Sequence, residues 1–263
     1  MRKYGLKLDT IEPEHYMLGS NSPIPLDVLQ VDKDWSEFLP TEEPQNLNGI
    51  EPYACVTFTI LNCVEILIKR KYGIEVNFSD RFLAEISGTK EGGNSPQVVC
   101  EFLRKIGVVP ESMWPFDTLI KSFEDFYAPL PPSLVKLAKE FTDTWDFKHE
   151  FVPATHEDIS AALQCSPLLI SVSAWHLDDE TQLFYRPAGS IDNHATTLIY
   201  EKDGQYRRVF DSYGDPFLKS IEWKAIPMQV KRFWIEKKST PPLSGKESLY
   251  AKIIRWFTNL LKK

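Results

Sequence analysis

Three residues that are far apart in the chain have the chemistry of a nucleophilic site. The first is Cys55, which begins an apolar stretch and follows Glu51-Pro52-Tyr53-Ala54. A cysteine in the first turn of a helix favours the thiolate, because the unpaired backbone N–H groups concentrate positive potential there. Taken alone, a cysteine is more commonly a small buried apolar side chain. Cys55 becomes a candidate nucleophile only if a base lies beside it.

The second and third residues are His194 and Asp211. His194 stands at the start of a predicted strand, and Asp211 ends the next one, before Ser212-Tyr213-Gly214. Two neighbouring antiparallel strands would bring the two side chains together. The carboxylate could then accept a hydrogen bond from one ring nitrogen while the other nitrogen faces the thiol. Separately, the histidine is also compatible with a satisfied strand-end residue and the aspartate with a turn former.

Helical signals occupy the first half of the chain. Apolar residues recur near helical spacing from Cys55 to Lys71, with cations at the end and Gly73 just beyond, which predicts a helix. A second helix is predicted over 96–106, where a proline lies in the first turn. Further helices are expected over 132–141 and 156–164, the last with Thr155 as N-cap.

The second half of the chain has strand signals instead. Short segments rich in β-branched and aromatic residues predict strands over 168–173, 195–200, 206–210 and 230–235. Lys202-Asp203-Gly204 between two of them is typical of a hairpin turn. Helices followed by strands indicate an α+β fold.

Several motifs resemble those of the papain-like cysteine peptidase family. Cys55-Val56-Thr57-Phe58 resembles the family's Cys-Trp-Ala-Phe, Asn193-His194-Ala195 its His-Ala motif, and Asp211-Ser212-Tyr213-Gly214 its Asn-Ser-Trp-Gly. The histidine follows the cysteine by about 140 residues, within the roughly 130–150 expected for this family.

Other matches lie between and before these motifs. Glu91-Gly92-Gly93-Asn94, followed by a helix and Trp114-Pro115-Phe116, is similar to the family's Asn-Gly-Gly, helix and Tyr-Pro-Tyr. Pro167–Val172 stands where the family has a Pro-Val-Ser-Val strand, and Leu6–Gly19 looks like the N-terminal arm of some bacterial members. The resemblance runs in order over about residues 41–235.

The resemblance implies a papain-like two-lobe fold. The helical lobe would span about 41–140 and the antiparallel β-barrel-like lobe about 141–238, with the cleft between them and residues 1–40 as an extended arm. The implied reaction is hydrolysis of a peptide bond in a protein or peptide substrate through a thioester on Cys55, with His194 as base and acid and Asp211 orienting it. No cofactor is required.

The resemblance also implies substrate-binding positions. Gly92 and Gly93 would line the cleft for backbone pairing with substrate, Asn193 would lie beside the base, and Tyr213 would shield the His–Asp contact from water. Trp175 and His176 could reach the cleft from the loop before the base. The remaining histidines, His15, His149, His156 and His176, are expected at the surface.

Two departures from the family pattern matter. The family has a Gln six residues before the nucleophile, where this chain has Gly49. We therefore expect Gln45 to complete the oxyanion hole with the Cys55 N–H, and Asn48 is the alternative. Asp211 replaces the usual Asn, and an anion should stabilise the imidazolium and extend the ion pair to higher pH.

The four cysteines, 55, 63, 100 and 165, are widely spaced. No Cys-x-x-Cys pair or zinc-like Cys/His spacing occurs, so neither a metal site nor a disulfide framework is expected. Cys63 and Cys100 are predicted to be core residues. Few cysteines, no secretory signal peptide and no long apolar run favour a cytoplasmic protein of bacterial or phage origin. A net charge of −7 argues against a nucleic-acid partner.

Residues 244–263 form a basic amphipathic pattern after Thr240-Pro241-Pro242. Such a helix could lie on an anionic membrane surface, contact a partner protein or pack on the peptidase body. At the other end, no long inhibitory prosegment precedes the motifs. We therefore expect that the chain needs no large propeptide removal, or that the N-terminal arm restrains it.

Two alternatives remain open at this point. A papain-fold amidase or acyltransferase acting on a non-protein amide would use the same residues. A catalytically inactive papain-like module could retain the cleft to bind peptides.

Overall fold

The helices of the first half of the chain lie where the sequence predicts them. In the computed structural model, which describes residues 4–19, 29–214 and 216–239, the predicted helices are α1 (Cys55–Tyr72), α3 (Pro96–Ile106), α5 (Pro132–Thr144) and α6 (His156–Leu163). Two short helices were not predicted, α2 (Asp80–Ile86) and α4 (Phe123–Phe126), together with short 3-10 turns at Ser36–Phe38, Leu47–Gly49 and Glu111–Met113.

Local capping accounts for several helix boundaries. The Ser95 side chain accepts a hydrogen bond from the Val98 N–H at the start of α3, and Thr155 accepts one from the Asp158 N–H at the start of α6, as predicted. At the end of α1, Gly73 takes a left-handed conformation with φ 63° and its N–H bonds the Lys69 carbonyl. The sequence signals for these ends therefore act through the expected hydrogen bonds.

The second half forms one antiparallel sheet. Its strands are β1 (Trp145–Phe151), β2 (Leu168–Val172), β3 (His194–Lys202), β4 (Tyr206–Phe210), β5 (Leu218–Glu222) and β6 (Val230–Lys237), in the order β1-β6-β2-β3-β4-β5. Every described neighbouring pair is antiparallel. The predicted α+β class is confirmed, and β2, β3, β4 and β6 match the predicted strands closely.

Strands β1 and β5 were missed because each carries charged or polar residues on a buried face. In β1, His149 and Glu150 are buried, so the prediction of a surface position for His149 is wrong. His149 Nε2 contacts Glu101 at 3.1 Å, and Glu150 pairs with Arg232 on β6. These pairs give hydrogen-bond partners to the His149 ring and to one carboxylate oxygen of Glu150, and the strand forms without a regular alternation of apolar and polar residues.

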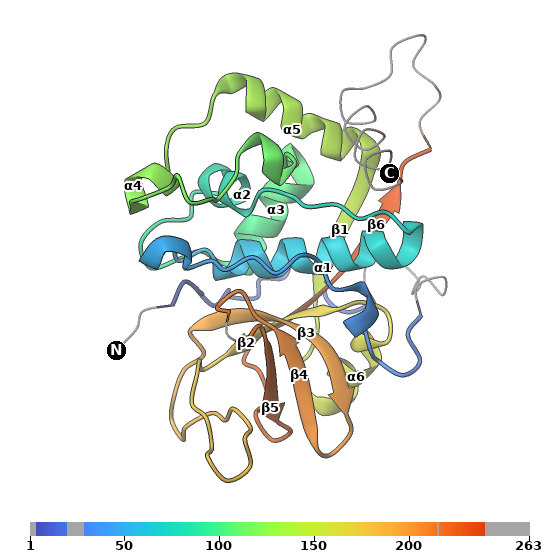
Figure 1. The fold of residues 1–263 in the computed structure, drawn as a ribbon. Coiled ribbons are helices and arrows are strands. Elements are labelled where there is room, and N and C mark those ends of the chain that lie inside the picture. Colours follow the sequence, from blue (N-terminus) through green and yellow to red (C-terminus); the bar gives the residue numbers. More distant parts are fainter. Residues whose placement is uncertain (1–3, 20–28, 215, 240–263) are drawn as a thin grey trace, which may run out of the picture.

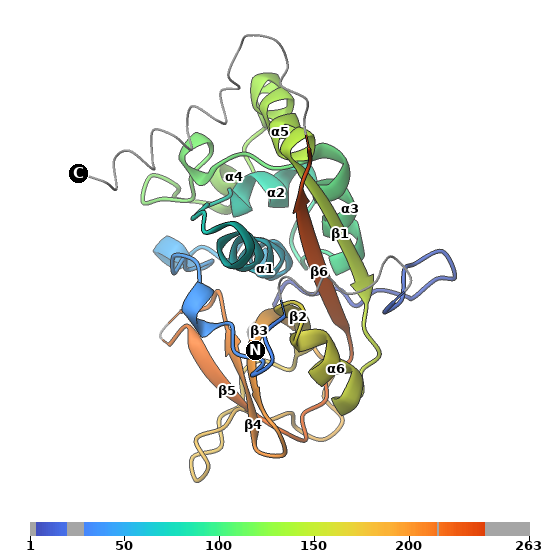
Figure 2. The same ribbon diagram turned by 90° about the vertical axis from the view of Figure 1, so that its right-hand side faces the viewer.

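Helix α1 lies in the middle of the molecule, between two groups of elements (Figure 1). Helices α2, α3, α4 and α5 are on one side of it, and strands β2 to β5 are on the other. Seen from the side, β1 and β6 run from the sheet towards α5, while α6 covers part of the sheet (Figure 2). Thirteen of the 18 residues of α1 are buried, so this helix is the centre of the core rather than a surface helix.

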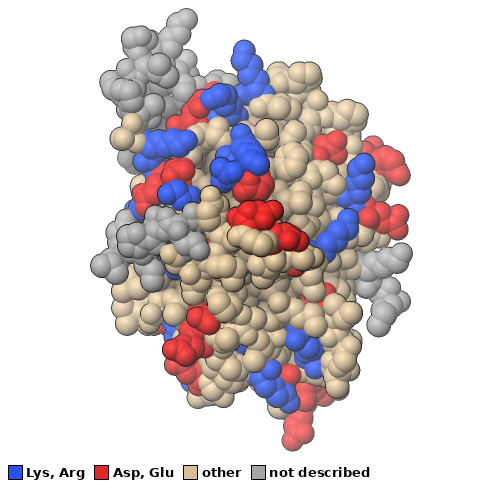
Figure 3. Space-filling view, turned by 180° about the vertical axis from the view of Figure 1, so that it is seen from behind, with Lys and Arg blue, Asp and Glu red and all other residues tan. Residues whose placement is uncertain are grey.

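The four cysteines are free thiols, and Cys63 and Cys100 are fully buried in the core as predicted. Cationic and anionic side chains are interspersed over the face seen in Figure 3. Among the described residues, no helix is long and apolar enough to cross a membrane. The predicted amphipathic helix over 244–263 lies outside the described residues.

Candidate active site

Cys55 is the first residue of α1, in the position that the sequence predicts. The residues before it are not helical: Tyr53 has φ 56°, and its N–H donates to Glu51 Oε1 at 3.0 Å. The helix starts when the Ala54 carbonyl accepts from the Thr57 N–H and hydroxyl. The thiol therefore lies in the first turn, where backbone N–H groups lack intrahelical acceptors and favour an anion.

Strands β3 and β4 bring His194 and Asp211 together. His194 is the first residue of β3, and Asp211 directly follows β4, which pairs with β3 in antiparallel register. His194 Nε2 lies 2.6 Å from Asp211 Oδ1, and both side chains are fully buried. The predicted contact between the histidine and the carboxylate is present.

The charges around His194 favour its protonated form. Burial by itself lowers the pKa of the imidazole, but the charges of Asp211 and Cys55 outweigh burial and raise the pKa of His194 to about 9. Burial alone would raise the pKa of Asp211, whereas the neighbouring cations His194 and Lys219 bring the pKa of Asp211 below its usual value. The site therefore holds an ionised carboxylate against an imidazolium at neutral pH.

The second ring nitrogen of His194 is available for proton transfer. His194 Nδ1 is buried and has no hydrogen-bond partner of normal geometry among the described residues, while a side-chain interaction with Cys55 contributes to the raised pKa of the ring. The Cys55 thiol is close enough to the ring to contribute to its raised pKa. Asp211 therefore holds Nε2, while the Cys55 side chain acts on the same ring.

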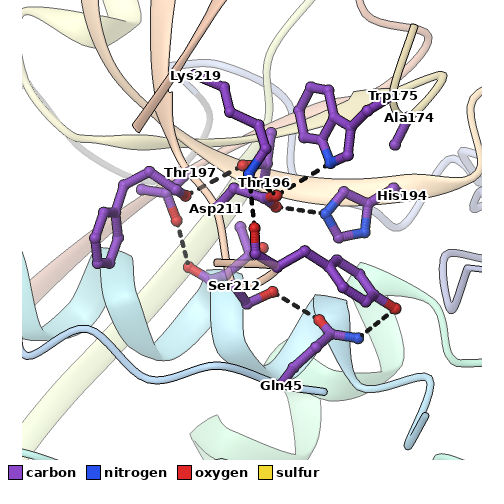
Figure 4. Close-up of polar contacts among 12 residues, drawn as sticks. Gln45, Ala174, Trp175, His194, Thr196, Thr197, Asp211, Ser212 and Lys219 are labelled. Atoms are coloured by element: carbon purple, nitrogen blue, oxygen red, sulfur yellow. Dashed lines mark hydrogen bonds and ion pairs between the residues drawn. The ribbon is translucent and has the colours of Figure 1, made fainter. Parts of the chain in front are cut away.

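Asp211 has two further partners that the sequence did not assign to it. Trp175 Nε1 donates to Asp211 Oδ2 at 3.0 Å, and Lys219 Nζ lies 2.8 Å from the same oxygen (Figure 4). The Trp175 ring centroid is 5.7 Å from that of His194. Trp175 was expected to be able to reach the cleft, and in the structure it lies beside Asp211 and His194. Lys219 was missed, because a lysine in a strand normally indicates an exposed position.

Gln45 is fully buried beside this cluster. Its Oε1 accepts from the Ser212 hydroxyl at 2.6 Å, and its Nε2 donates to the Tyr213 hydroxyl at 2.8 Å (Figure 4). Nε2 also lies 3.3 Å from Glu51 Oε1. The residue expected to donate to the oxyanion is therefore held next to the site, with its amide group engaged by Tyr213 and Glu51.

Asn48, the alternative donor, has a different environment. Its side-chain amide donates to the carbonyl oxygens of Asp117 and Ile120, at 3.3 and 2.8 Å. Its backbone φ is 57°, which asparagine tolerates in tight turns. In this structure Asn48 holds the loop over residues 117–120.

The predicted substrate-binding residues lie along the path of the N-terminal arm. Gly92 and Gly93 have φ 88° and 81°, and Gly93 is in close contact with Gly5. The Asn94 N–H donates to the Gly5 carbonyl at 2.9 Å, and the Lys7 N–H donates to the Asn94 carbonyl at 3.0 Å. These bonds pair the arm with the segment that the resemblance assigned to substrate.

The arm also reaches the base. The Leu6 N–H donates to the carbonyl of Asn193, the residue before His194, at 3.2 Å. The Tyr4 ring centroid lies 5.2 Å from that of His194 and 5.4 Å from that of Tyr213, whose own ring is 5.0 Å from His194. Tyr4 and Tyr213 together therefore cover the imidazole.

Within the described ranges, no cluster of three or more His, Cys, Asp or Glu side chains is arranged to hold a metal ion.

No protein-family model matches the sequence, and no curated protein matches it. Solved structures do match. Xylellain, a cysteine protease from Xylella fastidiosa, is 16% identical and superposes with a TM-score of 0.65 over 92% of this chain and 99% of its own. Bromelain from Ananas comosus is 19% identical, with a TM-score of 0.58 over 77% and 98% of the two chains.

Procathepsin L 3 from Tenebrio molitor larval midgut is 17% identical, with a TM-score of 0.59 over 83% of this chain and 73% of its own. All three similar structures are of papain-family cysteine proteases or their precursors, and the helices and antiparallel sheet of this chain match their two-lobe α+β fold. The chain therefore has the papain-like α+β fold.

Proposed function

We propose that this protein is a cysteine-type peptidase in which Cys55, His194 and Asp211 form the catalytic triad. The observation that carries the proposal is that the two nitrogens of the buried imidazole have different surroundings. Nε2 is held by the Asp211 carboxylate at 2.6 Å, and Nδ1 has no hydrogen-bond partner of normal geometry among the described residues. The ionised Cys55 side chain contributes to the raised pKa of the same ring. A nucleophile, a base and a group that orients the base are the three parts that a nucleophilic cysteine needs.

In the proposed reaction, the Cys55 thiolate attacks the carbonyl carbon of a peptide bond. The protonated His194 then gives its Nδ1 proton to the leaving amine, which leaves a thioester on sulfur. The same nitrogen takes a proton from water as the water attacks the thioester, so that the free acid is released and the thiolate and imidazolium are restored. The Cys55 N–H would stabilise the oxyanion in both steps, and the Gln45 amide would join it once one of its N–H groups is released from Tyr213 or Glu51.

The N-terminal arm would regulate access to this site. Cys55 is fully buried in the structure, and residues 4–7 lie against Tyr53, Asn94 and Asn193, the residue before His194. A peptide substrate would need the positions that Gly5 and Leu6 occupy. The arm would therefore have to move before a substrate binds.

Labelling of the thiol tests the proposal. The bromelain structure was solved in complex with the E64 inhibitor, so E64 is a suitable probe. We expect full-length protein to gain one label, located on Cys55 by peptide mass spectrometry, and Cys55→Ala to gain none. Cys63→Ala is the matched control, since that thiol is also fully buried but lies in the core, and it should label like the wild type.

Turnover separates catalysis from simple thiol reactivity. With a small ester substrate, rapid mixing should show a burst of leaving group that His194→Gln abolishes. Labelling without a burst would indicate a peptide-binding module, and a burst without cleavage of any peptide library would indicate an amidase or transferase on non-protein amides.

A further inference from the structure

Asp211, which contacts His194, is also paired with a buried cation, Lys219. This cation affects both the ionisation and the orientation of the Asp211 carboxylate. We infer that Lys219 is a positioning residue for the proposed triad, which keeps Asp211 ionised and aimed at the imidazole. The inference rests on the proposed function, since positioning has a purpose only if the imidazole reacts.

The first argument is the geometry of the ammonium group. Lys219 is only 6% exposed, and its Nζ lies 2.8 Å from Asp211 Oδ2. Nζ also donates to the carbonyl oxygens of Tyr213 and Pro216, at 2.7 and 2.6 Å. An ammonium group has three hydrogens, so these three acceptors satisfy it completely. Lys219 therefore has one fixed position.

The second argument is that the two oxygens of the Asp211 carboxylate have different partners. Oδ1 of Asp211 accepts from His194 and Oδ2 accepts from Lys219 and from Trp175 Nε1 (Figure 4). With Oδ2 fixed on one side by an indole and an ammonium group, the carboxylate cannot rotate away from the imidazole. Lys219 Nζ also lies 5.4 Å from the Trp175 ring centroid, so the two side chains support each other.

The third argument is charge balance. Asp211 is the only carboxylate that pairs with Lys219 in the described part of the chain. A buried charge without a partner costs several kcal/mol, whereas two neutral groups in the same place avoid that cost. The aspartate and the lysine are therefore expected to function as a unit, and replacing either one alone should be worse than replacing both.

The sign of the electrostatic effect follows from the groups that face the imidazole. These are the Asp211 carboxylate, the Cys55 thiol and the rings of Tyr4, Tyr213 and Trp175, with the Tyr213 hydroxyl hydrogen-bonded to Glu51. Lys219 is the cation that opposes Asp211. Its removal should raise the pKa of His194, and removal of both charges should lower it.

The test uses Lys219→Met, Asp211→Asn, the double variant and Lys219→Arg, which keeps the charge. The matched control is Lys224→Met, which makes the same change of net charge at a side chain 83% exposed. The readouts are the NMR titration of His194, assigned with His194→Gln, the thermal unfolding midpoint, and kcat/KM for a small ester.

We expect Lys219→Met to shift the His194 titration to higher pH, while Lys224→Met leaves it unchanged and Lys219→Arg shifts it less than Lys219→Met does. The double variant should exceed Asp211→Asn at least tenfold in kcat/KM and should also unfold at a higher temperature. If Lys219→Met itself folds poorly, the comparison of Asp211→Asn with the double variant still decides the matter.

Two results would overturn the inference. One is a Lys219→Met protein that folds and titrates at the wild-type pH. The other is a double variant that is no faster and no more stable than Asp211→Asn. The proposed function would instead be contradicted if neither the wild type nor Gly5→Ala, whose added Cβ would clash with the Tyr53 carbonyl oxygen and displace the arm, reacted with the ester or E64. The titration and unfolding data would still report on the Lys219–Asp211 pair.

Discussion

Gly5 offers a way to release the N-terminal arm without altering the cleft. Its φ lies outside the left-handed region, so alanine causes no backbone strain at this position. A Cβ on Gly5, however, would lie 2.0 Å from the carbonyl oxygen of Tyr53. Because that atom is backbone, it cannot turn aside as a flexible side chain would. Gly5→Ala should therefore prevent residues 4–7 from occupying their observed position.

The expected increase in the population with the arm displaced follows from the hydrogen bonds that are lost. Three backbone hydrogen bonds attach the arm to the cleft: Leu6 N–H to Asn193, Lys7 N–H to Asn94, and Asn94 N–H to Gly5. Each contributes about 0.5–1.5 kcal/mol net, or about 3 kcal/mol together. Since about 1.4 kcal/mol is a factor of ten, the open population should rise about 10²-fold.

The assay is the second-order rate of alkylation of Cys55 by iodoacetamide, because a small reagent reports access to sulfur without depending on peptide recognition. We expect Gly5→Ala to react up to about 10²-fold faster than wild type. Lys7→Ala is the control on the same arm, since that side chain is exposed and its backbone bond remains.

Gly93→Ala tests the same contact from the cleft. Its Cβ would lie 1.6 Å from the Gly5 carbonyl oxygen, whereas a Cβ on Gly92, with a similar φ, meets nothing within 4 Å. Cys55 should be alkylated faster in Gly93→Ala than in wild type, and Gly92→Ala should be alkylated at the wild-type rate. Combining Gly93→Ala with Gly5→Ala should increase the rate little beyond that of either single variant. Equal alkylation rates in wild type, Gly5→Ala and Gly93→Ala would refute the reasoning.

Three further predictions concern the site and the core. The pKa of His194 is raised to about 9, so the imidazolium should persist well above its ordinary pKa of about 6.5. The alkaline limb of kcat/KM against pH should therefore have its midpoint near 9. The stability that the His194–Asp211 pair contributes should be complete below about pH 6.5 and should be lost as the pH rises from there through about 9. A midpoint near 6.5 in ester hydrolysis would contradict this. Gln45→Ala should lower kcat by about 10²–10³-fold if its amide stabilises the oxyanion, and Asn48→Ala should not; similar small effects of both would exclude Gln45. Burial raises the pKa of Glu65 well above its usual value, so its favourable contribution is present below about pH 4.5 and is lost as pH rises. Glu65→Gln keeps an oxygen for the Phe78 N–H, and calorimetry should show a larger gain in thermal stability at pH 8 than at pH 5; a uniform gain would indicate another cause.

Some elements could be predicted because their signals are local. The helix from Cys55 is bounded by cations and Gly73, and Pro96 and Thr155 mark helix starts, because capping depends on residues a few positions away. Strand β4 was predicted with its observed limits. The His194–Asp211 contact followed from two strand ends and a hairpin, so it also needed only sequence-adjacent strands.

Other features depend on residues that meet only in the folded protein. Strand β5 was missed because Lys219 shares its buried face with Ile221, and a lysine in that place makes sense only when the Asp211 carboxylate is known to lie beside it. The buried His149 likewise depends on Glu101 and Lys231 from other elements.

The sequence alone therefore determined the order of helices and strands, the identity of the thiol, imidazole and carboxylate, and the resemblance that linked them. Only the tertiary structure decided that Lys219 and Trp175 hold the carboxylate, that Gln45 lies against Ser212 and Tyr213, and that Tyr4 of the arm covers the imidazole together with Tyr213. The physical reason is that a buried charge or an occupied cleft is defined by partners distant in the chain, and a local pattern contains no record of which distant residue will satisfy it.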